Sequence, residues 1–316
     1  MNAQEVYDVD AVGVAVREGA RPLRPPLLPR VLPYLFVAPA VALVLVVTIY
    51  PFIYSVYLSF FATPSRSMNL TFTGLGNYRV VFTDPVFYRV IRNTLVWTVV
   101  STAIDVVLGL VAAVAVNNLK VLRGAVRAAL LLPYVVGYVV ASYAWLWLLH
   151  GEYGLINGAL VTWHLVREPV SFLGNLSLVL PSLILANVWK TFPFAMLMLL
   201  AGLQNVPEQL LMAAKMDRAS PWRTFWEVTL PAIWPVLTVT TMLLTIHNFN
   251  SFTIPWIMTG GGPLHRSEII TNYIYNQAFT QLNFGLAAAT SCVTFALLMM
   301  FAVAYVRALS RGEGAR

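Results

Sequence analysis

The sequence has few charged residues, a single cysteine and widely separated histidines. Only 10% of its 316 residues are charged, whereas soluble domains carry about 25%. Because so few charged groups cannot cover a water-facing surface, the composition excludes an ordinary soluble globule. With Cys292 as the one cysteine, no disulfide can form within the chain and no cysteine cluster can hold a metal. The 59% of hydrophobic residues therefore indicates lipid as the surrounding solvent.

Motifs for enzyme chemistry are also missing. The sequence contains no G-x-x-x-x-G-K-[ST] phosphate-binding loop, and the run Gly260–Gly262 lacks the lysine of such a loop. The histidines His150, His164, His247 and His265 lie far apart, and no Ser/His/Asp set or acid pair falls within one apolar stretch. We therefore expect no catalytic residue, metal or cofactor in this chain.

Six apolar stretches are long enough to cross a bilayer as helices. A helix needs about 20 mostly apolar residues to span the hydrocarbon core, and the apolar residues run continuously, without the alternation of a barrel strand. Pro51, Pro133, Pro193 and Pro255 lie inside these stretches and mark expected kinks. The predicted fold is an all-α integral membrane protein with six transmembrane helices. The predicted spans are 33–61, 94–117, 126–149, 176–203, 232–258 and 285–308.

The two ends of the chain are polar. The first 30 residues hold four acids and no apolar core, so they are expected to form a cytoplasmic tail and not a cleaved signal peptide. Residues 31–309 then form the transmembrane domain, and residues 310–316 form a second cytoplasmic tail.

The distribution of lysine and arginine gives the expected orientation, because basic residues concentrate in cytoplasmic loops. With the N-terminus inside, the cytoplasmic segments hold thirteen basic residues and the external loops hold six, while Lys190 lies within a span. Both termini are therefore predicted in the cytoplasm (N-in/C-in). The net charge of +7 is a topology signal, and no nucleic-acid partner is expected. The cytoplasmic set is Arg17, Arg21, Arg24, Arg30, Lys120, Arg123, Arg127, Lys215, Arg218, Arg223, Arg307, Arg311 and Arg316, and the external set is Arg66, Arg79, Arg89, Arg92, Arg167 and Arg266.

One cytoplasmic connection, residues 204–231 between the fourth and fifth spans, has the pattern of a helix, a turn and a second helix. Pro207 and Glu208 favour a helix start, and apolar or small residues follow at helical spacing. Ser220–Pro221 ends that helix, and Trp222 to Val228 can form another. A short helical element outside the membrane is suited to being held by a partner.

This connection resembles the EAA loop of binding-protein-dependent ABC importer permeases. The matching positions are Pro207, Glu208, Ala213, Ala214, Asp217, Ala219, Phe225, Leu230 and Pro231. Two positions depart from the family's pattern: Met212 stands in place of a glutamate, and Arg218 in place of a glycine, whose backbone freedom it lacks. The resemblance implies a coupling helix whose ATPase-coupling residues are Glu208, Met212, Ala213, Ala214, Asp217, Arg218 and Ala219.

The resemblance extends from about residue 30 to residue 309. Phe36–Pro39, Gly74–Tyr78, Tyr153–Asn157 and Thr259–Pro263 are similar to segments of sugar-type permeases, and more similar to the first subunit of maltose permeases than to its partner. This implies a type I ABC importer fold in a bacterial inner (plasma) membrane. A second permease would complete a heterodimeric pore, two ATPase subunits would bind ATP and Mg²⁺, and an extracytoplasmic sugar-binding lipoprotein would deliver the substrate.

Polar residues inside spans are expensive in lipid and usually face a cavity. They gather in the fourth and fifth spans, where amides lie beside aromatic residues, a combination that suits a sugar. The maltose-permease likeness also places sugar contacts at Thr191, Phe194, His247, Asn248 and Ser251. The expected cargo is a di- or oligosaccharide. The predicted pathway residues are Asn187, Lys190, Thr191, Phe194, His247, Asn248, Ser251 and Phe252.

Several roles stay open. Asn248 and Asn250 cannot both face one way at a spacing of two, so one is expected to line the path and the other to pack helices. Lys190 is either a pore charge or a side chain that extends to the membrane surface, and Asp105 is expected to pair within the bundle. The alternatives are a cargo such as a polyol phosphate within the same family, or a proton-coupled carrier that uses Asp105 or Lys190.

Overall fold

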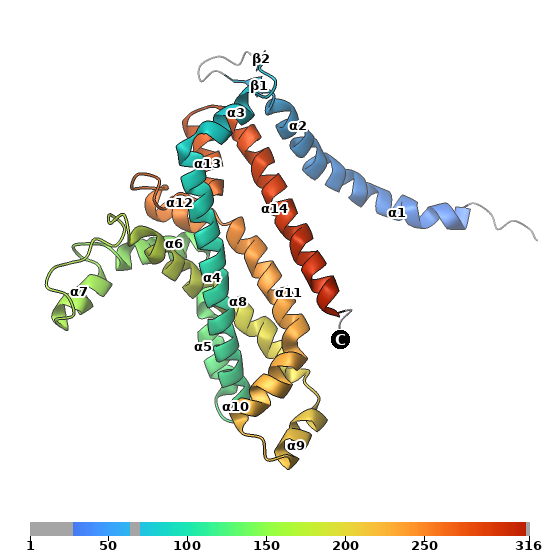
Figure 1. The fold of residues 1–316 in the computed structure, drawn as a ribbon, viewed down its shortest axis with the longest axis vertical. Helices are drawn as coiled ribbons and strands as arrows, with labels where there is room; N and C mark the ends of the chain where they lie inside the picture. The colour runs from blue at the N-terminus through green and yellow to red at the C-terminus, as the bar shows by residue number, and fades with distance from the viewer. Residues whose placement is uncertain (1–27, 64–69, 314–316) are drawn as a thin grey trace, which may run out of the picture. The chain divides into compact units, whose positions relative to one another are not determined.

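The computed structural model describes residues 28–63 and 70–313, which are almost entirely helical (Figure 1). The chain divides into two compact units, residues 1–54 and 55–316. The first unit consists of α1 (Leu28–Val44), the π-helical turn η1 (Leu45–Ile49) and the first residues of α2 (Tyr50–Leu58). The side chains from Phe36 to Tyr54 are exposed and apolar, as expected of a helix that faces lipid.

The second unit contains the other helices and one short hairpin. Its elements are β1 (Phe61–Ala62), β2 (Thr71–Phe72), α3 (Gly76–Thr83), α4 (Pro85–Asn118), α5 (Arg123–Val135), α6 (Tyr138–Leu148), α7 (Leu155–Thr162), α8 (Val179–Gln204), α9 (Glu208–Met216), α10 (Pro221–Thr224), η2 (Phe225–Thr229), α11 (Leu230–Phe249), α12 (Thr253–Thr259), α13 (Ile270–Tyr275), η3 (Asn276–Thr280) and α14 (Phe284–Glu313). The two strands pair antiparallel, with Phe61 opposite Phe72.

Two of the π-helical turns have the same cause. Both η1 and η2 are followed by one residue and then a proline, Pro51 and Pro231 respectively. A proline cannot donate to the carbonyl four residues earlier, and its ring clashes with that carbonyl. In each case this carbonyl lies inside the π turn, whose wider winding accommodates the ring without ending the helix.

The prediction of a multi-helix membrane protein is confirmed, with five helices long and apolar enough to cross a membrane among the described residues. They are Phe36–Leu58, Pro85–Asn118, Val179–Gln204, Pro221–Thr259 and Phe284–Tyr305. The predicted third span, 126–149, is instead two helices, α5 and α6, bent by 92°. The bend lies at Val136 and Gly137, whose backbones are extended, and not at Pro133, which lies inside α5. The count reaches six if this bent pair is one span.

The predicted outer loop 62–93 is largely helical. It contains α3 and the first turns of α4, which begins at Pro85. Asp84 is the N-cap of α4, and its carboxylate accepts the N–H of Val86 at 2.8 Å. Arg89 and Arg92 lower the hydropathy of these first turns. The apolar stretch therefore begins at residue 94, later than the helix itself, which begins at Pro85.

The helices α4, α8 and α11 form the centre of the second unit. Gly109 of α4 permits the closest approach, because a Cβ there would lie 2.9 Å from the backbone nitrogen of Met196 in α8. One turn earlier on both helices, Asp105 contacts Thr191. The two helices therefore run side by side in the same direction.

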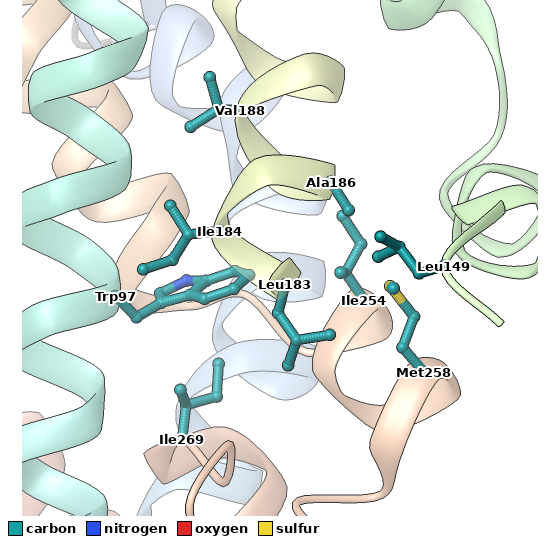
Figure 2. Packing of buried hydrophobic residues seen from close by; sticks show 9 residues of the cluster. All are labelled: Trp97, Leu149, Leu183, Ile184, Ala186, Val188, Ile254, Met258 and Ile269. Atoms are coloured by element: carbon teal, nitrogen blue, oxygen red, sulfur yellow. The ribbon is translucent and has the colours of Figure 1, made fainter. Parts of the chain in front are cut away.

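Figure 2 shows a buried apolar cluster next to this packing. Trp97 of α4 points toward Leu183 and Ile184 of α8, and Ile254 and Met258 of α12 complete the cluster on the other side. At the same end, the phenol of Tyr273 in α13 donates to Asp84 at 2.6 Å. Burial and this carboxylate raise the pKa of Tyr273, so the phenol stays a donor at physiological pH.

Candidate functional site

A hollow of about 460 Å³ lies where α11 ends and α12 begins. The backbone is broken here, since α11 ends at Phe249 and α12 starts at Thr253. Non-helical backbone at membrane depth occurs where it is buried in protein or lines a cavity. The hollow is lined by Tyr138, Leu243, Ile246, His247, Asn250, Ser251, Phe252 and Thr253.

Two side chains of α13 donate hydrogen bonds to the backbone of the broken turn, residues 250–252. The hydroxyl of Thr271 donates to the carbonyl of Ser251, and the Asn272 amide donates to the carbonyl of Phe252 at 3.2 Å. The Ser251 carbonyl has no helical partner, because Pro255 four residues later lacks an N–H, and the Thr271 hydroxyl satisfies it. The Phe252 carbonyl accepts the Trp256 N–H at 3.1 Å in addition to the Asn272 amide.

The walls of the hollow combine hydrogen-bonding groups with aromatic rings. His247 Nε2 lies 2.8 Å from the phenol oxygen of Tyr138, which α6 brings to the opposite wall. The Phe252 ring stacks on Trp256, with centroids 5.6 Å apart. Polar groups that fix orientation, set among apolar and aromatic side chains, are the usual construction of a small-molecule site.

Lys190 lies behind this wall. Its ammonium donates to the carbonyl of Tyr134 at 2.7 Å and lies 4.6 Å from the centre of the Tyr138 ring, within the range of a cation–π contact. The ring of Tyr134 in turn stacks on Phe194, with centroids 6.2 Å apart. The side chain of Lys190 is thus enclosed by aromatic residues. Only 3% of Lys190 is exposed, so it does not extend to the surface of the chain.

A fully buried polar network joins α4, α8 and α11. One carboxylate oxygen of Asp105 accepts from the Thr191 hydroxyl at 2.8 Å, and the other accepts from Asn248 Nδ2 at 3.1 Å. Asn248 Nδ2 also reaches the Thr102 hydroxyl at 3.1 Å, and Asn248 Oδ1 accepts from Asn187 Nδ2 at 2.9 Å. The expectation that Asp105 pairs within the bundle agrees with these contacts.

The predicted pathway residues therefore fall into two groups. His247, Ser251 and Phe252 border the hollow, whereas Asn187, Lys190, Thr191, Phe194 and Asn248 are not among its lining residues. The two amides at a spacing of two do face different ways: Asn248 is buried in the network, and Asn250 lines the hollow. Tyr138 was missed because it lies in another span, and sequence spacing does not show which spans meet.

A second hollow, of about 630 Å³, lies between the loop after α6 and the loop before α8. The buried Asn157 of α7 ties these loops together, donating to the carbonyls of His150, Gly151 and Val170 and accepting from the Val170 N–H. None of the predicted pathway residues lines it. The Tyr153–Asn157 segment noted in the sequence is thus a structural clamp.

The predicted coupling helix is α9, Glu208–Met216. Its end is a Schellman motif: the N–H of Ala219 bonds the carbonyl of Ala214 at 2.9 Å, and the N–H of Arg218 bonds that of Lys215 at 3.1 Å. Arg218 takes the left-handed conformation, φ 50°, that this motif normally gives to glycine.

The two faces of α9 differ in exposure. Ala214 is buried against the rest of the chain, whereas Met212, Ala213 and Met216 are exposed on the opposite face, Met216 to 85%. The predicted second helix, Trp222 to Val228, is not separate. The chain instead continues from α10 through η2 into α11 without a break.

The sequence matches the family of binding-protein-dependent transport system inner membrane components over residues 105–312. The matched region contains the hollow, α9 and all of the buried network except Thr102. The chain belongs to this family.

Named relatives of the permease match along nearly its whole length. The trehalose transport system permease protein SugA of Mycobacterium tuberculosis is 36% identical over 304 residues, covering 94% of this chain and 93% of that protein. The trehalose/maltose transport system permease protein MalF of Thermococcus litoralis is 33% identical over 274 residues, covering 87% and 92%. The recognition of an ABC importer permease is confirmed.

The fold of the permease is also found in a solved structure. A bacterial ABC transporter involved in the import of the acidic polysaccharide alginate matches with a TM-score of 0.78 and 21% identity, covering 90% of this chain and 97% of that one. At this identity the match concerns the fold alone. The permease is thus a multi-pass inner-membrane protein with an ABC importer permease fold.

Proposed function

We propose that this permease is one of two pore-forming subunits of an ATP-driven importer that carries a di- or oligosaccharide into the cytoplasm. In this proposal the chain spans the membrane six times, with α5 and α6 together as the third span. Residues 1–30 and 310–316 are cytoplasmic tails around the membrane domain 31–309. The chain itself is non-catalytic: two ATPase subunits bind ATP and Mg²⁺, and an extracytoplasmic binding lipoprotein delivers the sugar.

The observation that carries the proposal is the exposed face of α9. Met212, Ala213 and Met216 present an apolar and small-residue surface on a short helix outside the predicted spans. An exposed apolar patch of this kind commonly marks a protein interface, and the family resemblance assigns the position to the ATPase.

The orientation is supported by charge. The connection between α4 and α5 and the segment containing α9 and α10 lie at the same end of the second unit (Figure 1). These two segments carry Lys120, Arg123, Lys215 and Arg218. Basic residues gathered at one end favour the cytoplasmic side for that end.

The sugar assignment rests on the relatives and on the hollow. The relatives named above are permeases for trehalose and for trehalose/maltose. A hollow with His247, Asn250 and Ser251 offers hydrogen bonds to hydroxyls, and Phe252 offers a ring to the C–H face of a sugar.

Affinity purification through a tag on this chain tests the subunit composition. The expected result is recovery of a different permease and an ATPase, in a ratio of one to one to two. A complex that contains only copies of this chain would overturn the assignment.

A further inference from the structure

We propose that Asp105 is a positioning residue for the hollow: through Asn248 it fixes the end of α11, which carries His247, and the broken turn that carries Asn250 and Ser251. The inference rests on the proposed function of the hollow as the sugar site, but it concerns a residue that does not border that site. It also assigns a role to Asn187, Thr191 and Asn248, which lie behind the hollow instead of lining it.

The first step is the orientation of the Asn248 amide. Asp105 is 0% exposed, and both of its carboxyl oxygens accept hydrogen bonds, one from the Thr191 hydroxyl and one from Asn248 Nδ2. Asn248 must therefore turn Nδ2 toward Asp105 and Thr102, which leaves Oδ1 for the amide of Asn187. Thr191 occupies the second carboxylate oxygen and closes the network.

The second step links Asn248 to the break between α11 and α12. Asn248 stands at the last turn of α11, directly after His247 and two residues before Asn250. Its backbone carbonyl accepts from Trp97 Nε1 at 3.0 Å and from the Ser251 N–H at 3.1 Å. Side chain and backbone of this one residue thus anchor the end of the helix to α4 and shape the turn that follows.

The third step is the consequence for the hollow. His247 comes from the last turn of α11, and Asn250, Ser251 and Phe252 come from the broken turn that Asn248 anchors, whereas Tyr138 comes from α6 on the opposite wall. Sites of this kind require their side chains to be held by a supporting layer of packed and hydrogen-bonded residues. A change in the pairing of Asp105 with Asn248 therefore shifts one wall of the hollow relative to the other.

A chemical reporter in the hollow measures this shift without relying on transport. In the complete transporter with Cys292→Ala, Ser251→Cys places the reporter thiol in the hollow, and its rate of reaction with N-ethylmaleimide is measured in membranes. Adding Asn248→Asp removes the amide group that donates to Asp105 and Thr102, and it places two buried carboxyl groups side by side, which cannot both be ionised. We expect the labelling rate to change by at least about fivefold, because a buried polar pair is broken.

The decisive variant is the exchanged pair Asn248→Asp with Asp105→Asn. Every hydrogen bond of the network can then form: donor and acceptor are reversed between positions 105 and 248 and at the Thr102 hydroxyl, while Asn187 and Thr191 donate as before. The labelling rate is expected to return to within about twofold of the starting protein, since coupled residues show such non-additivity. A rate that stays altered in the exchanged pair would overturn the inference.

The matched control is Thr240→Val, a fully buried residue of α11 whose hydroxyl bonds Val236 of its own helix and not the network. It should leave the labelling rate unchanged. If Asn248→Asp does not accumulate in membranes, Thr191→Val replaces it, removing one donor to Asp105 at nearly constant volume. If Asn248→Asp or Thr191→Val accumulates in membranes and its labelling rate is unchanged, the positioning role of Asp105 is contradicted.

Protection by sugar separates this inference from the proposed function. Trehalose and maltose are added as probes before N-ethylmaleimide. Protection of the Ser251→Cys thiol supports the sugar site, and its absence with both probes counts against that site. The labelling rate of the exchanged pair does not depend on whether a sugar binds, because it reports only the geometry of the wall of the hollow.

Discussion

At the scale of single residues, the turn after α9 is one of the places where a non-glycine residue takes a left-handed backbone conformation. Arg218 has φ 50°, and a side chain with a Cβ in this left-handed region costs about 1–2 kcal/mol. Its N–H and that of Ala219 nevertheless close the Schellman motif of the coupling helix. The departure from glycine noted in the sequence thus falls at the position where glycine would relieve strain.

Replacing Arg218 with glycine is therefore expected to stabilise the end of α9 by about 1 kcal/mol. Hydrogen exchange of the Ala219 amide in the purified chain should slow by about fivefold. Arg218→Ala is the matched control, because it removes the charge but keeps the Cβ, and it should leave exchange unchanged. Equal slowing in both variants would mean that charge and not backbone strain governs this turn.

The candidate site shows at residue scale what sequence reasoning could reach. His247, Ser251 and Phe252 line the hollow, and the sequence points to them because polar and aromatic residues gather at the end of one apolar stretch. Asn187 and Thr191 lie behind it because their partners stand in different spans, Asn248 for Asn187 and Asp105 for Thr191. Hydropathy gives the length of a helix but not the direction in which its polar groups face, so contact between these residues and a sugar stays a prediction.

At the scale of elements, the packing of α4 on α8 depends on Gly109. A Cβ at this position would press on the Ala195 side chain and on backbone atoms of α8. Overpacking of this kind typically costs about 1–3 kcal/mol, so Gly109→Ala should lower the thermal midpoint of the detergent-solubilised permease by at least about 3 °C.

Gly124 of α5 provides the control for this substitution. A Cβ there would meet nothing within 4 Å, and alanine favours a helix over glycine. Gly124→Ala should therefore not lower the midpoint. A fall in Gly124→Ala as large as that in Gly109→Ala would show that close helix packing is not the cause.

The exposed face of α9 gives a second test at this scale. Met216→Glu places a charge in the surface proposed to meet the ATPase, and burial of an unpaired charge is unfavourable by several kcal/mol. Recovery of the ATPase with the tagged permease should fall by at least about tenfold, while Met216→Leu should retain it. Ala214 is unsuitable for this purpose, because its side chain packs against the permease itself.

The limits of element prediction have physical causes. Apolar length located the spans but placed the start of α4 at residue 94 instead of Pro85, because its first turns are polar. The bend between α5 and α6 depends on the extended conformation of Val136 and Gly137, which neighbouring helices impose. The predicted turn at Ser220–Pro221 does separate α9 from a second helix, but that helix does not end at Val228, because π winding at η2 lets it continue past Pro231 into α11.

At the scale of the whole molecule, the second unit contains both the α9 surface proposed to meet an ATPase and the broken turn that borders the hollow. The element α11 connects them directly, since it begins after η2 next to the coupling segment and ends at the broken turn. A displacement of α9 and α10 by a partner can therefore reach the hollow through one continuous helix. This arrangement fits the proposal of ATP-driven transport.

Transport by the purified assembly tests the central claim most directly. The complex recovered through this chain is placed in proteoliposomes with its binding protein outside, and uptake of labelled trehalose and maltose is followed with and without internal ATP. The account predicts accumulation of at least one of the two sugars that requires ATP and is unaffected by collapse of the proton gradient. Uptake that persists without ATP and stops when the proton gradient is collapsed would contradict it.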